Sequence, residues 1–130
     1  MILIHENDAP AMDVPAPYKR ILKVLLSPLI DDGPKSIAVG QTILPPGSQS
    51  EKHVHTEGEM FYVVSGCGLI EIENERQELI PGTAVWSPSQ TSHSLINNSV
   101  EELKVLWVLS PPGREADIVE HAHKSRGIDV

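Results

Sequence analysis

Three histidines and one glutamate in the middle of the chain are the residues best suited to chemistry. His53 and His55 are two apart, so an extended strand would turn both imidazole rings to the same face. Glu59 follows a turn-like segment and His93 lies on a later stretch, from which both can return to the same place. Three neutral imidazoles and one carboxylate suit a divalent transition metal ion and leave two octahedral positions open. A substrate can bind and react at such open positions.

The histidine pair alone also has a simpler explanation. A His-x-His pair on a strand is more often at the surface or hydrogen-bonded than bound to metal, so His53 and His55 need support from other residues. A second pair, His121 and His123, lies in a charged C-terminal segment, where a helix would turn the two rings to different sides. We assign this second pair to the solvated surface.

Short β-branched segments separated by proline and glycine must position these residues. The 130 residues include eleven prolines and nine glycines, a composition typical of an all-β sandwich or barrel. The predicted strands are 21–26, 36–44, 60–64, 69–73, 83–87, 92–96 and 103–109. Residues 115–124 predict one short amphipathic helix.

The length allows one domain and little more. Residues 1–17 carry three prolines without clear periodicity and predict an N-terminal arm that lies on the body or on a neighbouring subunit. Residues 18–113 would form the barrel, and residues 114–130 a C-terminal helix and tail. Cys67 is the single cysteine, so the chain can form no internal disulfide.

The spacing of the chemical residues resembles the two signature motifs of the cupin superfamily. The matching positions are Gly47, His53, His55, Glu59 and Gly66 in the first motif, and Gly82, Pro88, His93 and Asn97 in the second. The resemblance implies a single antiparallel jelly-roll barrel that holds one metal ion through His53, His55, Glu59 and His93. Gln90 stands where the second motif usually has glycine, and a residue with a side chain is less free to adopt a positive φ.

Strand alternation identifies candidates for the pocket wall, because residues of equal parity share a face. The candidates that share the parity of a ligand residue, together with one tryptophan, are Phe61, Val63, Leu95 and Trp107. Tyr62 has the opposite parity to Glu59 and should point outward. No side chain stands out as a catalytic acid or base, so the catalytic residues stay unknown at this stage.

Three arginines could bind a substrate carboxylate: Arg20, Arg76 and Arg114. Arg20 lies where the predicted arm meets the first strand. For this residue, a structural ion pair is a simpler explanation than a contact with substrate.

The ligand set accepts iron, manganese, nickel, cobalt, copper or zinc. The leading hypothesis is a metal-dependent enzyme for a compact oxygenated or carboxylated metabolite, either dioxygenase-like or a non-oxidative decarboxylase or isomerase. The alternative is a non-catalytic cupin module that binds a sugar or a small acid. In a third interpretation, the metal only stabilises the barrel.

Charge and hydropathy limit the partners. The net charge of −8 opposes the phosphate neutralisation that drives nucleic-acid binding. The N-terminal residues lack a basic segment followed by an apolar one, and the apolar runs are short, so we expect no membrane segment and a cytoplasmic location. The apolar runs 21–26 and 105–109 exceed what one small barrel needs and predict a homodimer.

Overall fold

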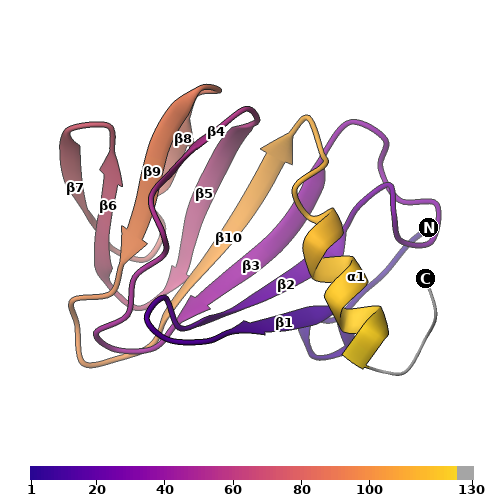
Figure 1. Cartoon of the computed structure of the whole chain (residues 1–130), viewed down its shortest axis with the longest axis horizontal. Helices are drawn as coiled ribbons and strands as arrows, with labels where there is room; N and C mark the ends of the chain where they lie inside the picture. The colour runs from indigo at the N-terminus through magenta and orange to yellow at the C-terminus, as the bar shows by residue number, and fades with distance from the viewer. Residues whose placement is uncertain (126–130) are drawn as a thin grey trace.

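Two antiparallel β-sheets form the body of the protein (Figure 1). The computed structural model describes residues 1–125. The larger sheet has six strands in the order β1 (Ala11–Val14), β2 (Arg20–Leu26), β3 (Ala38–Leu44), β10 (Leu103–Ser110), β5 (Gly58–Ser65) and β8 (Ala84–Ser87). The smaller sheet has four, in the order β4 (His53–His55), β9 (Thr91–Ile96), β6 (Gly68–Ile72) and β7 (Glu75–Leu79). The predicted all-β jelly-roll architecture is confirmed.

The core lies between the inner faces of these sheets. Along β10, the buried residues alternate with more exposed ones, so every second side chain enters the core. The buried side chains of β5 and β10 in this cluster are Phe61, Val63, Leu103, Val105, Trp107 and Leu109. The parity argument is correct for Tyr62, which is 42% exposed on the outer face.

Helix α1 (Ala116–Ser125) covers the end of the larger sheet formed by β1 and β2 (Figure 1). Its buried side chains are Ile118, Val119 and Ala122. Glu115, which precedes the helix and is 1% exposed, anchors it: Ser27 Oγ donates a hydrogen bond of 2.6 Å to Glu115 Oε2. Within residues 1–125, no helix is long and apolar enough to cross a membrane.

The observed elements differ from the predicted ones mainly at the two sheet edges. The seven predicted strands are present, with ends shifted by at most two residues, and the helix begins one residue later than predicted. Strand β1, in the predicted arm, pairs with β2, and β7 pairs with β6; neither strand was predicted. Four of the five residues of β7 are exposed, so the strand carries little hydrophobic signal. Residues 126–130 of the predicted tail lie outside the described residues.

The first residues of the arm lie on the outer face of the larger sheet. A 3₁₀ helix spans Glu6–Asp8. Lys23 Nζ donates to the backbone oxygen of Glu6 at 3.0 Å, and Lys104 Nζ lies 2.9 Å from Glu6 Oε2. The arm therefore lies on the body of its own chain.

Gln90 adopts the left-handed backbone conformation, with a φ of 64°. Its N–H donates to the backbone oxygen of His55 at 2.6 Å, which ties the turn between β8 and β9 to the end of β4. The turn expected of glycine is thus formed by a residue with a side chain, for which this conformation is strained.

We predict that Gln90→Gly raises the free energy of unfolding by about 0.5–1 kcal/mol, because relief of the strained φ exceeds the entropy that glycine adds to the unfolded chain. Urea denaturation measures the change. The matched control is Gln77→Gly in β7, where glycine should lower stability. A Gln90→Gly variant no more stable than the parent contradicts the prediction.

Candidate functional site

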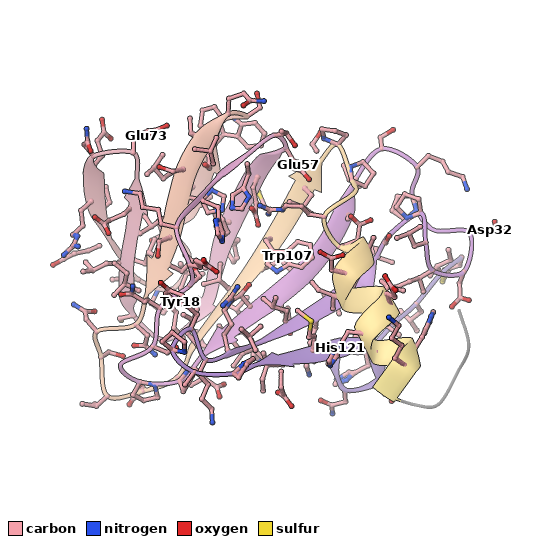
Figure 2. The ribbon with its side chains drawn as sticks, in the orientation of Figure 1. Tyr18, Asp32, Glu57, Glu73, Trp107 and His121 are labelled. Atoms are coloured by element: carbon pink, nitrogen blue, oxygen red, sulfur yellow. The ribbon has the colours of Figure 1, made fainter. Side chains whose placement is uncertain are left out.

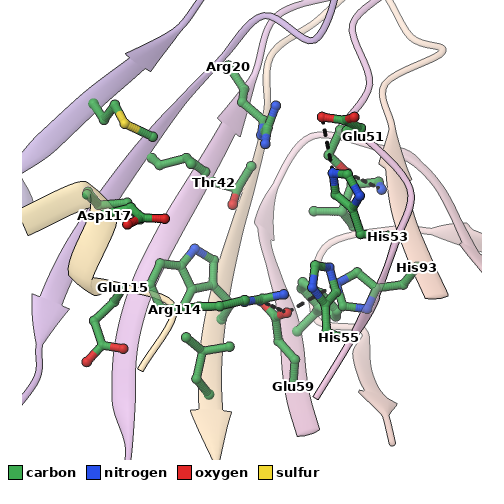
Figure 3. A pocket seen from close by; sticks show the side chains of 18 residues that line it. Arg20, Thr42, Glu51, His53, His55, Glu59, His93, Arg114, Glu115 and Asp117 are labelled. Atoms are coloured by element: carbon green, nitrogen blue, oxygen red, sulfur yellow. Dashed lines mark hydrogen bonds and ion pairs between the residues drawn. The ribbon is translucent and has the colours of Figure 1, made fainter. Parts of the chain in front are cut away.

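A cavity of about 300 Å³ lies between the larger sheet, the smaller sheet and the beginning of α1 (Figure 3). The four predicted ligands, His53, His55, Glu59 and His93, all line it. They reach it from strands β4, β5 and β9. Donors distant in sequence therefore face one space.

The apolar wall of the cavity includes Phe61, Leu95 and Trp107. Trp107 lies in the interior of the molecule (Figure 2). Its ring passes directly over Gly40, where a Cβ atom would come within 2.2 Å of the indole, so a side chain there would displace the tryptophan. Val63, also predicted for the wall, is not among the lining residues; it is fully buried in the core beside Val105 of β10.

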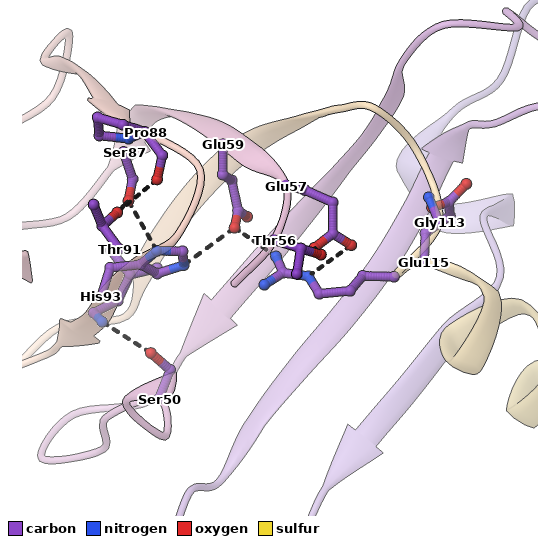
Figure 4. Close-up of polar contacts among 12 residues, drawn as sticks. Ser50, Thr56, Glu57, Glu59, Ser87, Pro88, Thr91, His93, Gly113 and Glu115 are labelled. Carbon is purple, nitrogen blue, oxygen red and sulfur yellow. Dashed lines mark hydrogen bonds and ion pairs between the residues drawn. The ribbon is translucent and has the colours of Figure 1, made fainter. Parts of the chain in front are cut away.

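His93 and Glu59 form the buried centre of the site (Figure 4). His93 Nε2 lies 3.1 Å from Glu59 Oε1. The other ring nitrogen, Nδ1, shares a hydrogen bond of 3.1 Å with the hydroxyl of Ser87, which is 1% exposed. Ser87 therefore fixes the orientation of the imidazole that points Nε2 toward the glutamate.

The other two histidines approach from β4. His53 is the register partner of His93, and the ring centroid of His55 lies 4.5 Å from that of His93. The centroids of His53 and His55 are 6.0 Å apart. His53 Nε2 lies 3.1 Å from Glu51 Oε2, so its donor atom is engaged by a carboxylate of the same chain.

Arg114 holds the candidate carboxylate ligand from the opposite side. Its Nη2 atom donates to Glu59 Oε1 at 2.5 Å, and its Nε atom lies 3.9 Å from Glu57 Oε2. Arg114 immediately precedes Glu115, the residue that anchors α1 to Ser27. The position of the helix thus determines where the guanidinium enters the cavity.

The donor types and their strand positions fit a divalent ion. Two neighbouring ligands with bonds of about 2.0–2.2 Å to one ion place their donor atoms about 3 Å apart. His93 Nε2 and Glu59 Oε1 already have that separation, 3.1 Å. Among residues 1–125, however, no three such side chains direct their donors at one point. His53 is instead in contact with Glu51, and Glu59 accepts a hydrogen bond from Arg114.

Burial keeps His55 in the neutral form that a metal ion requires. The pKa of His55 is lowered to about 4. Desolvation is the largest cause, and the positive charge of Arg114 is the next. The attraction of Glu59 opposes the shift. At pH 7 the ring is therefore uncharged.

The sequence analysis did not identify Ser87, and it named Arg114 only as a candidate for binding a substrate carboxylate, not as a partner of Glu59. Ser87 is the register partner of Glu59 across β8 and β5, and Arg114 reaches Glu59 from 55 residues away. Strand pairing and the docking of α1 create both contacts. Neither leaves a spacing pattern in the sequence that could have revealed it.

The fold and the clustered donors together define the class of protein. Residues 40–109 match the family model described as the cupin domain. The chain belongs to the cupin family, as its two motifs predicted.

Similar proteins are known from several organisms. An uncharacterized protein of Methanocaldococcus jannaschii is 34% identical over 98 residues, which cover 75% of this chain and 78% of that protein. A structure from Thermotoga maritima, described as a predicted oxalate decarboxylase, has a TM-score of 0.74 at 21% identity, covering 85% of this chain and all of the other. The polyketide cyclase RemF of Streptomyces resistomycificus has a TM-score of 0.73 at 19% identity, covering 95% and 93%. These two structures share the fold.

We predict that His55 in chelator-treated protein titrates with a midpoint near pH 4, well below the ordinary value of 6.5. Because the unfolded chain binds this proton more readily, the contribution to stability is complete above pH 6.5 and is lost as the pH falls toward 4. NMR of the imidazole C–H signals measures the midpoint, and urea denaturation at several pH values measures the stability.

The comparison that tests this assignment is His55→Asn beside His121→Asn, an exposed histidine of α1. The first variant should lose less stability between pH 6.5 and 4 than the parent, whereas the second should follow the parent. A His55 midpoint close to 6.5 would exclude the proposed desolvation.

Proposed function

We propose that this cupin binds one divalent transition metal ion through His53, His55, Glu59 and His93 and acts on a compact oxygenated or carboxylated metabolite. The observation that carries the proposal is that all four side chains line one cavity. The cavity volume of about 300 Å³ lies at the lower end of the range for ligand pockets, which favours a small substrate.

The metal ion would supply a positive centre that polarises a bound oxygen anion, because three neutral imidazoles and one carboxylate leave one net positive charge on it. The residues of the chain have distinct tasks. Ser87 orients His93, and Arg114 holds Glu59 Oε1. Phe61, Leu95 and Trp107 limit the access of water and so strengthen electrostatic contacts inside the cavity.

Both a dioxygenase and a non-oxidative decarboxylase or isomerase are compatible with these ligands, with iron, manganese, nickel, cobalt, copper or zinc as the ion. The two structural neighbours are named for different chemistries, decarboxylation and polyketide cyclisation. At their low identity, the substrate has to be inferred from the pocket of this chain.

The alternative function is a non-catalytic module that binds a sugar or a small acid. One observation favours it: two carboxylates of the cavity, the candidate ligand Glu59 and the neighbouring Glu51, are already engaged. Glu59 accepts from Arg114, and Glu51 contacts His53. Within the described part of the cavity, neither carboxylate is free to act as an acid or base.

The exposed outer face of the larger sheet supports a homodimer as a further proposal. Trp86 pairs with Met60, and Tyr62 pairs with Ala84, so their side chains share this outward face. Trp86 is 56% exposed and Val64 is 47% exposed. A contiguous apolar surface on β5 and β8 suits an interface between two copies related by a twofold axis.

We predict that His53→Ala or Glu59→Ala abolishes stoichiometric metal binding and any metal-dependent turnover, because each removes a donor from the set. Elemental analysis of protein purified without a histidine tag measures the metal. Oxygen uptake and product analysis against keto acids, diketones and catechols measure turnover. His121→Ala, on the exposed side of α1, is the matched control and should retain both properties.

Three outcomes separate the hypotheses. Turnover that persists after complete removal of the metal would contradict the proposal of a metal-dependent enzyme. Stoichiometric binding of a ligand that is recovered unchanged from aerobic, metal-loaded protein would favour the binding module. Chelation that lowers the melting temperature, with no effect of any metabolite, would leave the metal a structural role only.

For the dimer, we predict twice the monomer mass by light scattering at micromolar concentration. Tyr62→Glu places a charge in the proposed interface and should shift the protein to the monomer. Gln77→Glu, which adds the same charge on the edge strand β7, should leave the mass unchanged. A monomeric parent protein refutes the proposal.

A further inference from the structure

Arg20 enters the same cavity from the larger sheet (Figure 3). It is the first residue of β2, and its side chain is partly buried. Its Nη1 atom donates to the backbone oxygen of Tyr18 at 2.8 Å, which uses one of the five N–H donors of a guanidinium. In the part of the chain that the structure describes, no carboxylate lies within ion-pair distance of Arg20. The structural ion pair considered from the sequence is therefore not formed there.

The charged groups nearest the candidate ligands have partners. Arg114 contacts Glu59 and Glu57. Glu51 contacts His53. Arg20 thus differs from the second cavity arginine, since it keeps donors that no carboxylate of the described residues accepts.

The remaining cavity acids do not neutralise Arg20 by contact. Glu115 is buried and accepts hydrogen bonds from Ser27 and from the backbone of Gly113. Asp117 lies in the first turn of α1 and is exposed to solvent. Burial lowers the pKa of Arg20, and the attraction of Glu51 opposes this; the guanidinium stays protonated at pH 7.

A hydroxyl lies beside this cation. Thr42 of β3 is 5% exposed and lines the cavity. It is the register partner of Leu22, which follows Arg20 by two residues on the same inner face. Figure 3 shows the side chains of Arg20 and Thr42 in the same part of the cavity, on the larger sheet, whereas His53 and His93 belong to the smaller sheet.

We propose that Arg20, assisted by Thr42, binds a carboxylate of the substrate on the side of the cavity that the larger sheet forms. The inference rests on the proposed function, because the other end of the substrate would bind to the metal ion. It narrows the substrate class to compact acids with a chelating keto or hydroxy acid group at one end and a second carboxylate at the other. A planar guanidinium can accept such a carboxylate with two parallel hydrogen bonds.

The net charge of −8 makes Arg20 a selective site for an anionic group. The protein as a whole repels anions, so a partly buried cation with free donors provides a local exception. A monoacid of equal length would leave those donors without an acceptor and would bind more weakly.

The test uses matched ligands and nickel-loaded protein without oxygen, studied by isothermal titration calorimetry. The diacids 2-oxoglutarate, 2-oxoadipate and 2-oxopimelate are compared with 2-oxopentanoate, 2-oxohexanoate and 2-oxoheptanoate, which end in a methyl group instead of the second carboxylate. We expect one diacid to bind the parent protein at least about tenfold more tightly than its monoacid, the scale of a charge-assisted hydrogen-bond pair.

Arg20→Met should abolish this preference by weakening the diacid about tenfold or more, with the monoacid changed less than about twofold. Arg20→Lys should retain part of the preference, because it keeps the charge and loses the fork. Arg76→Met is the matched control: it removes an equal charge from a surface pair with Glu71 and should leave the preference intact.

The outcomes are distinguishable. Equal binding of all diacids and monoacids by the parent overturns the carboxylate assignment while leaving the metal proposal standing, and so does a preference that survives Arg20→Met. Equal weakening of both ligand types by Arg20→Met assigns Arg20 a structural role instead. If the protein binds neither nickel nor any other of the six candidate ions, the proposed function fails. The carboxylate subsite is then judged in metal-free protein, where pentanoate must shift the Arg20 Nε–H NMR signal or the inference is wrong.

Discussion

A buried carboxylate is the constraint on which the rest of the site depends. Glu59 is 4% exposed on the inner face of β5, and an ionised carboxylate in such a place requires hydrogen-bonding or charged partners. Arg114 and His93 supply them from two different parts of the fold. The approach of Arg114 requires α1 to be docked through Glu115, and the orientation of His93 requires β8 to present Ser87. The short C-terminal helix is therefore part of the site as well as a cover for the larger sheet.

The same arrangement explains how a metal ion and an arginine could share one carboxylate. Arg114 donates to Oε1 of Glu59, and no hydrogen bond to Oε2 is formed within the described residues. A divalent ion bound to Glu59, as proposed, would lower the negative charge available to Arg114 and would link the position of the helix to metal affinity. The neighbouring His55 is already neutral at pH 7 because of burial and the charge of Arg114. The arginine thus helps keep one candidate ligand in its metal-binding form while it competes for another.

Periodicity and motif spacing predicted the parts of this molecule that depend on local sequence. The apolar runs that became β3, β5 and β10 lie between glycine- and proline-rich turns, and the residues of the two motifs, His53, His55, Glu59 and His93, line one cavity. Strand β7 was missed because four of its five residues are exposed, and β1 because its partly buried Met12 lies in a proline-containing segment without clear periodicity. At Gln90 the residue type was misleading instead: the surrounding turn holds it at a left-handed φ, which a residue with a side chain adopts less readily than glycine.

The cavity has two chemically different sides because a different sheet forms each of them. The larger sheet extends through β3, β2 and β1 beyond the four-stranded sheet, and α1 covers this extension. The three histidines of the cavity come from the smaller sheet, whereas the inner face of the larger sheet carries Arg20 and Thr42. A ligand that fills the cavity must therefore contact both sides. The metal ligands would be the same in a catalytic and a binding cupin, so the contacts on the larger sheet would select the substrate.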